Sequence, residues 1–144
     1  MSYLEVKDVC KVYGSGNVRV EALSEVSFGL EKGEFVVILG SSGAGKTTLL
    51  NVLGGMDKAT SGEIVLDGKT VSSLDRRGLV EYRRNDVGFV FQFYNLMPNL
   101  TALENVEIAV EICKDALDPK AILTEVGLGE RLNNFPSQLS GGEQ

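Results

Sequence analysis

Residues 40–47 read GSSGAGKT and lie between an apolar run and a segment with helical spacing. Gly40, Gly43 and Gly45 carry no Cβ, so the backbone can take positive φ angles and turn several N–H groups toward one point. The spacing G-x-x-x-x-G-K-[ST] is typical of a loop that binds the phosphate groups of a nucleotide. In such a loop Lys46 can reach the β- and γ-phosphates, and the Thr47 hydroxyl can ligate Mg²⁺.

The residues on either side of this loop favour the same interpretation. Residues 35–39 (FVVIL) predict a strand that is buried on both faces. Residues 47–53 have the apolar spacing of a helix, which would end at Gly54-Gly55 and direct its positive dipole end at an anion. The alternative is a flexible Gly-Ser loop before a lysine, a pattern that chance produces in roughly one chain of this composition in a hundred.

The composition excludes several other classes of protein. The net charge is −6 and no basic stripe is present, which argues against a nucleic-acid binder. The absence of histidine excludes Ser-His and Cys-His hydrolases and histidine-based metal sites. Cys10 and Cys113 are far apart and are expected to be two lone, buried thiols. The 144 residues suit one domain, and no signal peptide or long apolar run is present, so we expect a soluble, cytoplasmic chain.

Alternating and apolar runs predict the strands of an α/β fold. The expected strands cover residues 4–12, 18–23, 26–30, 35–39, 63–66 and 87–91. Residues 14–17 are expected to form a turn, and residues 67–69 a hairpin-type turn. The first strands are half-exposed and antiparallel, whereas 35–39 and 87–91 are apolar throughout and predict buried strands.

Helices are expected after the loop and again in the second half of the chain. The charged stretch 72–84 predicts a surface helix rather than a basic patch for nucleic acid. Thr101 and Glu104 form the pattern of a capping box before a helix over 103–112. Asp118 and Pro119 begin another helix, which reaches about Val126. We therefore expect a nucleotide-binding core with an antiparallel β subdomain over 1–95, and the start of a helical subdomain over 96–144.

Four short segments then follow one another in a recognisable order. They are Val12-Tyr13-Gly14, the glycine-rich loop, residues 88–92 (GFVFQ) and residues 139–144 (LSGGEQ). In this order they resemble the ATP-binding subunit of an ABC transporter, a family with a P-loop NTPase-type core. The resemblance covers the whole chain but only the first part of the family's domain, and LSGGEQ is its specific signature motif.

The resemblance implies a role for individual residues. Tyr13 matches the aromatic residue that stacks on adenine, although a tyrosine at a strand end can also be a core residue. Gln92 matches a glutamine that touches Mg²⁺ and the attacking water, although it could simply end a strand. Lys46 and Gln92 are thus the expected catalytic residues, and Thr47 and Gln92 the expected magnesium ligands. The expected phosphate cradle consists of Gly40, Ser41, Ser42, Gly43, Ala44, Gly45, Lys46, Thr47 and Thr48.

The resemblance also implies partners. Ser140, Gly141 and Gly142 match the segment that reaches across a head-to-tail dimer to the γ-phosphate on a second ATP-binding subunit, with Ser140 capping a helix. A membrane-spanning transporter subunit is the other expected partner, which would hold the chain peripherally at the inner face of the cell membrane. Residues 93–106 further resemble the subgroup that serves macrolide export and lipoprotein release.

The sequence departs from the family pattern at its end, because it stops inside the signature. In the family, the next strand supplies an aspartate that orders Mg²⁺ and a glutamate that polarises water, and a switch histidine follows. We therefore expect a truncated or cleaved product, or a deliberate fragment, with an incomplete sheet, weak or absent nucleotide binding and negligible hydrolysis by the 144-residue chain. One alternative is a non-catalytic fragment that self-associates through its open sheet edge. Another is an ABC-type ATPase of DNA repair.

Overall fold

The computed structural model describes residues 2–15, 18–111, 113 and 115–144. These residues form two compact units, Met1–Gly88 and Phe89–Gln144. The functional division expected between residues 95 and 96 stays a prediction.

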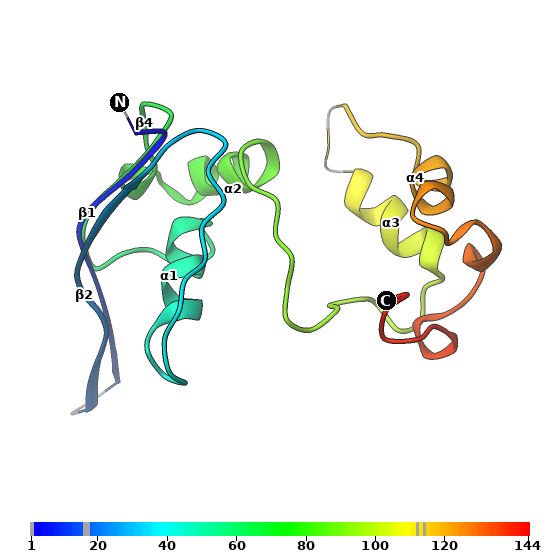
Figure 1. The fold of residues 1–144 in the computed structure, drawn as a ribbon, viewed down its shortest axis with the longest axis horizontal. Coiled ribbons are helices and arrows are strands. Elements are labelled where there is room, and N and C mark those ends of the chain that lie inside the picture. Colours follow the sequence, from blue (N-terminus) through cyan, green and yellow to red (C-terminus); the bar gives the residue numbers. More distant parts are fainter. Residues whose placement is uncertain (1, 16–17, 112, 114) are drawn as a thin grey trace. The chain divides into compact units, whose positions relative to one another are not determined.

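The first unit contains an antiparallel sheet whose strands are ordered β2-β1-β3-β4 (Figure 1). The strands are β1 (Leu4–Ser15), β2 (Val18–Leu30), β3 (Ser61–Leu66) and β4 (Lys69–Thr70). The expected hairpin turn between β3 and β4 is confirmed, since Asp67 and Gly68 have φ angles of 47° and 78° and Leu66 pairs with Lys69. Positive φ at both central residues is what a tight hairpin requires.

The two longest strands pair with interruptions. The expected strands 18–23 and 26–30 are one strand, β2, whose register with β1 shifts three times between Val6 and Val12. Asp8 and Glu25 take positive φ angles at these shifts, and the Ser27 hydroxyl donates to Asp8 Oδ1 at 2.9 Å. Such bulges increase the twist of a strand pair. The turn expected over 14–17 includes residues 16 and 17, which lie outside the described residues.

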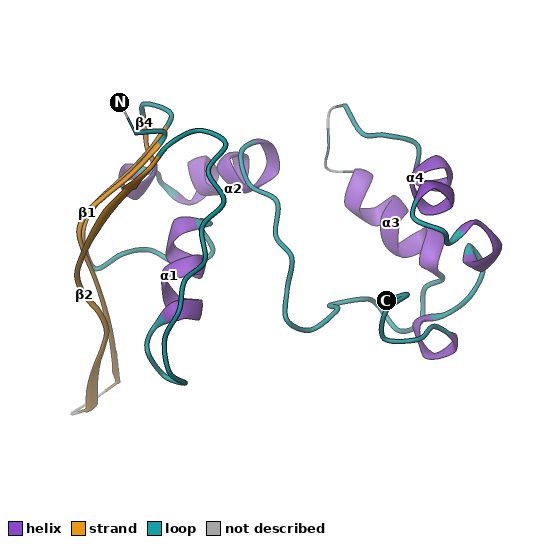
Figure 2. Ribbon diagram, in the orientation of Figure 1, coloured by secondary structure: helices purple, strands orange, loops and turns teal. Residues whose placement is uncertain are grey.

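Two helices, α1 (Lys46–Leu53) and α2 (Arg76–Asn85), pack on one face of this sheet (Figure 2). A 3₁₀ helix, Val71–Ser73, precedes α2, so the helix expected over 72–84 is broken at Asp75, whose carboxylate caps α2. The core combines sheet and helix residues: Val6, Val9, Leu23, Leu49, Val52, Ile64, Val71, Leu79 and Tyr82. The Tyr82 hydroxyl donates to the Leu53 carbonyl at 2.8 Å and so joins α2 to the end of α1.

The prediction of buried strands at 35–39 and 87–91 is wrong. Neither segment is a strand, and neither pairs with any strand of the described residues. Phe35 is 92% exposed, Leu39 86% and Val90 100%. An apolar run becomes a buried strand only when neighbouring strands satisfy its backbone groups, and the antiparallel sheet offers it no such neighbour. Within the first unit, only Ile38 and Val87 of these runs pack against the core.

The second unit contains α3 (Ala102–Val110) and α4 (Pro119–Glu125). The expected caps are confirmed: Thr101 and Glu104 form the capping box of α3, and the Asp118 carboxylate accepts from the Ala121 N–H at 2.9 Å. The expected end of the first helix at residue 112 lies outside the described residues. Two 3₁₀ helices follow, Gly129–Arg131 and Pro136–Gln138. Buried Ala102, Leu123 and Leu139 belong to this unit.

The cysteines differ from expectation in one respect. Cys10 is half-buried, but Cys113 is exposed, so the prediction of two buried thiols is wrong for Cys113. Among the described residues, no helix combines the length and apolar character needed to span a membrane.

Candidate functional site

The glycine-rich loop makes a compact turn before α1. The Ala44 N–H donates to the Ser41 carbonyl at 3.2 Å, and the Leu49 N–H donates to the Gly45 carbonyl at 2.8 Å as α1 begins. Gly43 and Gly45 have φ angles of 80° and 83°, in the left-handed region that favours glycine. Two such residues separated by one let the chain reverse and turn its N–H groups toward a common point, as anion-binding loops do.

Gly45 also lies against strand β2. A Cβ atom at this position would lie 2.4 Å from the Ala22 carbonyl oxygen and 3.2 Å from Leu23 Cδ2. Only glycine therefore fits between the start of α1 and the strand. A Cβ at Gly43 would meet no atom within 4 Å, so that glycine is required by its φ angle alone.

The Lys46 ammonium lies over the loop from the first residue of α1. It donates to the Gly40 carbonyl at 2.8 Å and to the Ser41 carbonyl at 2.6 Å. Both acceptors are neutral carbonyl oxygens, and an anionic phosphate oxygen would attract the ammonium more strongly because it carries the opposite charge. The Lys46 ammonium is thus held at the loop, and it can replace a hydrogen bond to a carbonyl oxygen with one to a phosphate oxygen.

The loop borders a cavity of about 230 Å³. Its walls come from β2 and from the loop with the first residues of α1, namely Val20, Glu21, Ala22, Gly43, Ala44, Gly45, Lys46, Thr47 and Thr48. Thr47 is exposed and Thr48 half-buried. Mg²⁺ in nucleotide sites commonly takes one or two protein oxygens, with phosphate and water completing the shell. The Thr47 hydroxyl fits that requirement, and Glu21 is the carboxylate that lines this cavity.

Tyr13 stands at the far end of β1. Its hydroxyl donates to Asp57 Oδ2 at 2.8 Å, and the Lys11 ammonium lies 4.8 Å from the centre of its ring. The hydrogen bond to Asp57 raises the pKa of Tyr13, burial adds to this, and the Thr48 hydroxyl of the loop opposes it. Tyr13 remains 42% exposed and is not a core tyrosine.

The second unit holds the other expected site residues. Gln92 is exposed and does not end a strand in this structure. Residues 141–143 form a turn in which the Ser140 carbonyl accepts from the Glu143 N–H at 3.0 Å, and the Glu143 carboxylate accepts from the Ser140 N–H at 2.7 Å. That backbone hydrogen bond, with one from the Ser140 side chain, lowers the pKa of Glu143. A Cβ at Gly141 would lie 2.9 Å from the Tyr94 hydroxyl.

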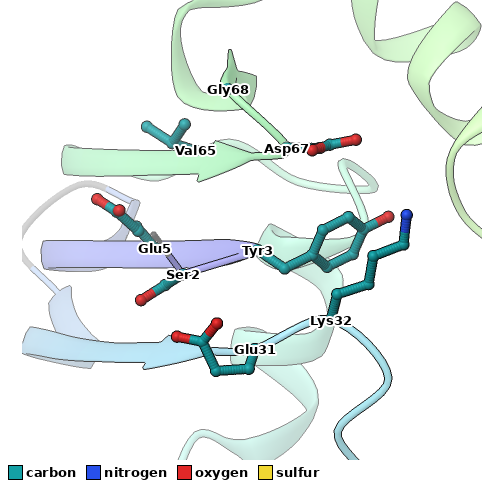
Figure 3. Close-up of a pocket in the computed structure, with 8 residues that line it drawn as sticks. All are labelled: Ser2, Tyr3, Glu5, Glu31, Lys32, Val65, Asp67 and Gly68. Carbon is teal, nitrogen blue, oxygen red and sulfur yellow. The ribbon is translucent and has the colours of Figure 1, made fainter.

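A second cavity, of about 530 Å³, lies where the chain enters β1, leaves β2 and turns from β3 to β4, and it shares no lining residue with the loop cavity (Figure 3). Glu5, Glu31 and Asp67 line it, and the Lys32 ammonium lies 5.7 Å from the centre of the Tyr3 ring. Its three carboxylates disfavour a phosphate ligand, so the loop cavity is the candidate nucleotide site.

The structure adds three residues to those expected from the sequence: Glu21, Ala22 and Asp57. Ala22 contributes a backbone oxygen and Asp57 lies 44 residues after Tyr13, so neither leaves a pattern in the sequence. A place for Glu21 and Ala22 in the site could have been predicted only by knowing that β2 lies beside the loop. The roles of the loop residues, Tyr13, Gln92 and Ser140–Gly142 in binding stay predictions.

A glycine-rich loop that carries Lys46 and Thr47 into the first turn of a helix is the arrangement found in proteins of the phosphate-loop class. The model of the ABC transporter family matches residues 23–144. The chain therefore belongs to the ABC transporter family.

Curated relatives cover nearly all of the chain. An ABC transporter ATP-binding protein of Thermotoga maritima is 48% identical over 98% of the chain and 62% of its own length. The lipoprotein-releasing system ATP-binding protein LolD of Syntrophotalea carbinolica is 45% identical over 98% of the chain and 64% of its length. The macrolide export ATP-binding/permease protein MacB of Hyphomonas neptunium is 47% identical, with the match covering 23% of that longer protein. The chain thus spans less than two thirds of the length of these relatives.

Solved structures agree with this assignment. A dimeric ATP-binding cassette in a post-hydrolysis state, bound to ADP and Pi, has a TM-score of 0.84 and 40% identity to the chain. The match covers 97% of the chain and 64% of the cassette. A second dimeric ABC transporter cassette has the same TM-score, identity and coverage. The expected α/β, P-loop NTPase-type fold is confirmed, and the alternative of a non-catalytic, self-associating fragment is not favoured.

Proposed function

We propose that the chain is the ATP-binding part of an ABC transporter ATPase, which couples the binding and hydrolysis of MgATP to transport across a membrane. The observation that carries this proposal is the cradle formed by two left-handed glycines and the Lys46 ammonium beside a cavity of about 230 Å³. The MacB and LolD relatives, named for macrolide export and lipoprotein release, support the subgroup that serves these two processes.

Each site residue has a role in this proposal. The N–H groups over residues 40–48 and the Lys46 ammonium bind the phosphates, and the Thr47 hydroxyl ligates Mg²⁺. Tyr13 stacks on the adenine base. Gln92 would orient the attacking water and, with Thr47, hold Mg²⁺. When bound, Mg²⁺ would neutralise negative charge on the phosphates.

The remaining proposals concern partners and turnover. In this proposal Ser140, Gly141 and Gly142 contact the γ-phosphate on a second copy in a head-to-tail dimer. The two solved cassettes are dimeric, which supports the dimer but not these contacts. A membrane-spanning subunit holds the protein at the inner face of the membrane, and nucleic acid is not a partner. Glu21 on β2 is the one carboxylate among the described residues that line the loop cavity, and no second carboxylate stands there to activate water. We therefore expect negligible hydrolysis by the 144-residue chain alone.

Equilibrium dialysis of the chain against MgATP tests the proposal. We expect weak but saturable binding that Lys46→Ala reduces about tenfold or more, because the variant loses a hydrogen bond between charged groups. Lys120→Ala is the matched control, since it removes the same charge from an exposed position on α4. Binding that does not saturate, or that both variants reduce equally, would contradict a specific phosphate site. Turnover by the wild-type chain that Lys46→Ala abolishes would contradict the expectation of negligible hydrolysis.

A further inference from the structure

Tyr13 is held by groups that come from a distant part of the chain. Asp57, in the turn after α1, accepts the Tyr13 hydroxyl on Oδ2 at 2.8 Å. Its Oδ1 accepts the Lys11 ammonium at 2.6 Å and the Lys58 N–H at 2.7 Å. The Asp57 carboxylate thus accepts three hydrogen bonds. Those from Lys11 and Lys58 hold it in place, and it in turn holds the hydroxyl end of the Tyr13 ring.

Lys11 acts on the ring itself. Lys11 and Tyr13 are two apart on β1 and therefore lie on the same face of the strand. The Lys11 ammonium is 4.8 Å from the ring centre, donates to the Lys58 carbonyl at 2.7 Å, and its side chain is only 12% exposed. One face of the ring is therefore covered by a cation that is itself anchored, while much of Tyr13 stays open to a ligand.

The ring also stands beside the phosphate loop. Thr48 lines the loop cavity, and its hydroxyl partly opposes the rise in the pKa of the Tyr13 phenol that Asp57 causes. A flat ring that is already ordered at the end of a phosphate site loses little side-chain freedom when a base stacks on it. If the ring rotated freely before binding, the loss of that rotational freedom would weaken the binding of the base.

We propose that Lys11 and Asp57 are positioning residues that hold the Tyr13 ring in place as the stacking platform for the adenine base of the nucleotide. This inference rests on the proposed function, because it concerns the same nucleotide site. The Asp57 carboxylate and the Lys11 ammonium do not touch the nucleotide in this proposal. They strengthen the binding of the adenine base through Tyr13 and leave the binding of the phosphates unchanged.

The competing explanation is purely structural. Lys11 and Asp57 could serve only to tie β1 to the turn after α1. Loss of that tie would displace the loop as well as the tyrosine, and would weaken every ligand of the site to the same extent. The two explanations therefore differ in how ATP compares with a ligand that has phosphates but no base.

The test measures dissociation constants for MgATP and for magnesium tripolyphosphate by NMR titration of the chain. The variants are Asp57→Asn, Tyr13→Phe and Tyr13→Ala. We expect Asp57→Asn and Tyr13→Phe to weaken MgATP about three- to tenfold, the range for one side chain that must be ordered on binding. Tripolyphosphate affinity stays within about twofold of wild type in every variant. In a Tyr13→Ala background, Asp57→Asn has no further effect on MgATP, because no ring remains to be positioned.

Asp86→Asn is the matched control. Asp86 pairs with Lys69 at 2.8 Å and its side chain is 33% exposed, as is that of Asp57. The Lys69 ammonium likewise lies over a tyrosine, 5.7 Å from the centre of the Tyr82 ring. Asp86→Asn therefore removes an equivalent ion pair away from the loop cavity, and we expect unchanged affinity for both ligands.

The outcomes separate the inference from the proposed function. If Asp57→Asn weakens the affinities for MgATP and for tripolyphosphate equally, the positioning role is overturned, whereas the proposed nucleotide site is not. An effect of Asp57→Asn that persists in the Tyr13→Ala background has the same consequence. If the wild-type chain binds neither ligand, the proposed function fails, and the inference fails with it.

Discussion

Replacing Gly45 by alanine tests whether the phosphate loop packs against β2 as the structure has it. An alanine at φ 83° costs about 1–2 kcal/mol because its Cβ crowds the carbonyl. At this position the Cβ would also lie 2.4 Å from the Ala22 oxygen, whereas Cβ atoms essentially never come within 3.0 Å of such an atom. Overpacking against a backbone that must move costs about 1–3 kcal/mol more. The total is about 3 kcal/mol.

Gly43→Ala is the matched control for this prediction. Its φ angle is nearly the same, 80°, but its Cβ would meet nothing within 4 Å, so only the conformational cost of about 1–2 kcal/mol applies. The difference between the variants therefore isolates the contact with β2.

Urea unfolding followed by tyrosine fluorescence measures both variants. Three of the four tyrosines, Tyr3, Tyr13 and Tyr82, lie in the first unit, and the chain has no tryptophan to mask them. With a slope of about 1–3 kcal/mol per molar urea, Gly45→Ala lowers the midpoint by about 1 M or more and Gly43→Ala by roughly half as much. Equal midpoints for the two variants would refute the packing of Gly45 against Ala22.

Two further predictions concern a helix cap and a buried phenol. Thr101→Ala removes the capping box of α3 and should lower the protection of α3 amides from hydrogen exchange by about 1 kcal/mol. The Thr101 N–H and hydroxyl lower the pKa of Glu104, so the part of the box that the Glu104 carboxylate forms is present above pH 4.5 and is lost as the pH falls through the lowered value; protection that does not change with Thr101→Ala or on acidification would contradict it. Burial raises the pKa of Tyr82 to about 12 from the usual 10.0, so absorbance at alkaline pH should show a phenol that ionises near pH 12 and that Tyr82→Phe removes. The stability that this phenol contributes is present below pH 10 and is lost as the pH rises toward 12; a titration in which all phenols ionise together would contradict the burial.

Local signals in the sequence predicted the local structure well. The Asp67-Gly68 hairpin and the caps at Thr101 and Asp118 formed as expected, because each depends on neighbouring residues only. The glycine-rich loop was found in the same way, since its chemistry is contained in eight consecutive residues.

Properties that depend on distant residues could not be predicted. The apolar run 35–39 indicated burial, but burial requires a neighbouring strand, and Phe35 is almost fully exposed. The same limit applies to the site. Asp57 binds Lys11 and Tyr13 across more than 40 residues, and Ala22 approaches Gly45 through a backbone oxygen that no side-chain pattern reveals.

The most direct test of the central claim is to locate nucleotide phosphate on the chain by NMR. Amide shifts of the 15.5-kDa chain are recorded as MgADP is added, with Lys46→Ala under the same conditions. We predict that the largest shifts fall on the amides of residues 40–48, whose N–H groups form the cradle, and that Lys46→Ala reduces them at equal MgADP. Shifts that are absent from residues 40–48, or that centre on the cavity lined by Glu5, Glu31 and Asp67, would contradict the account.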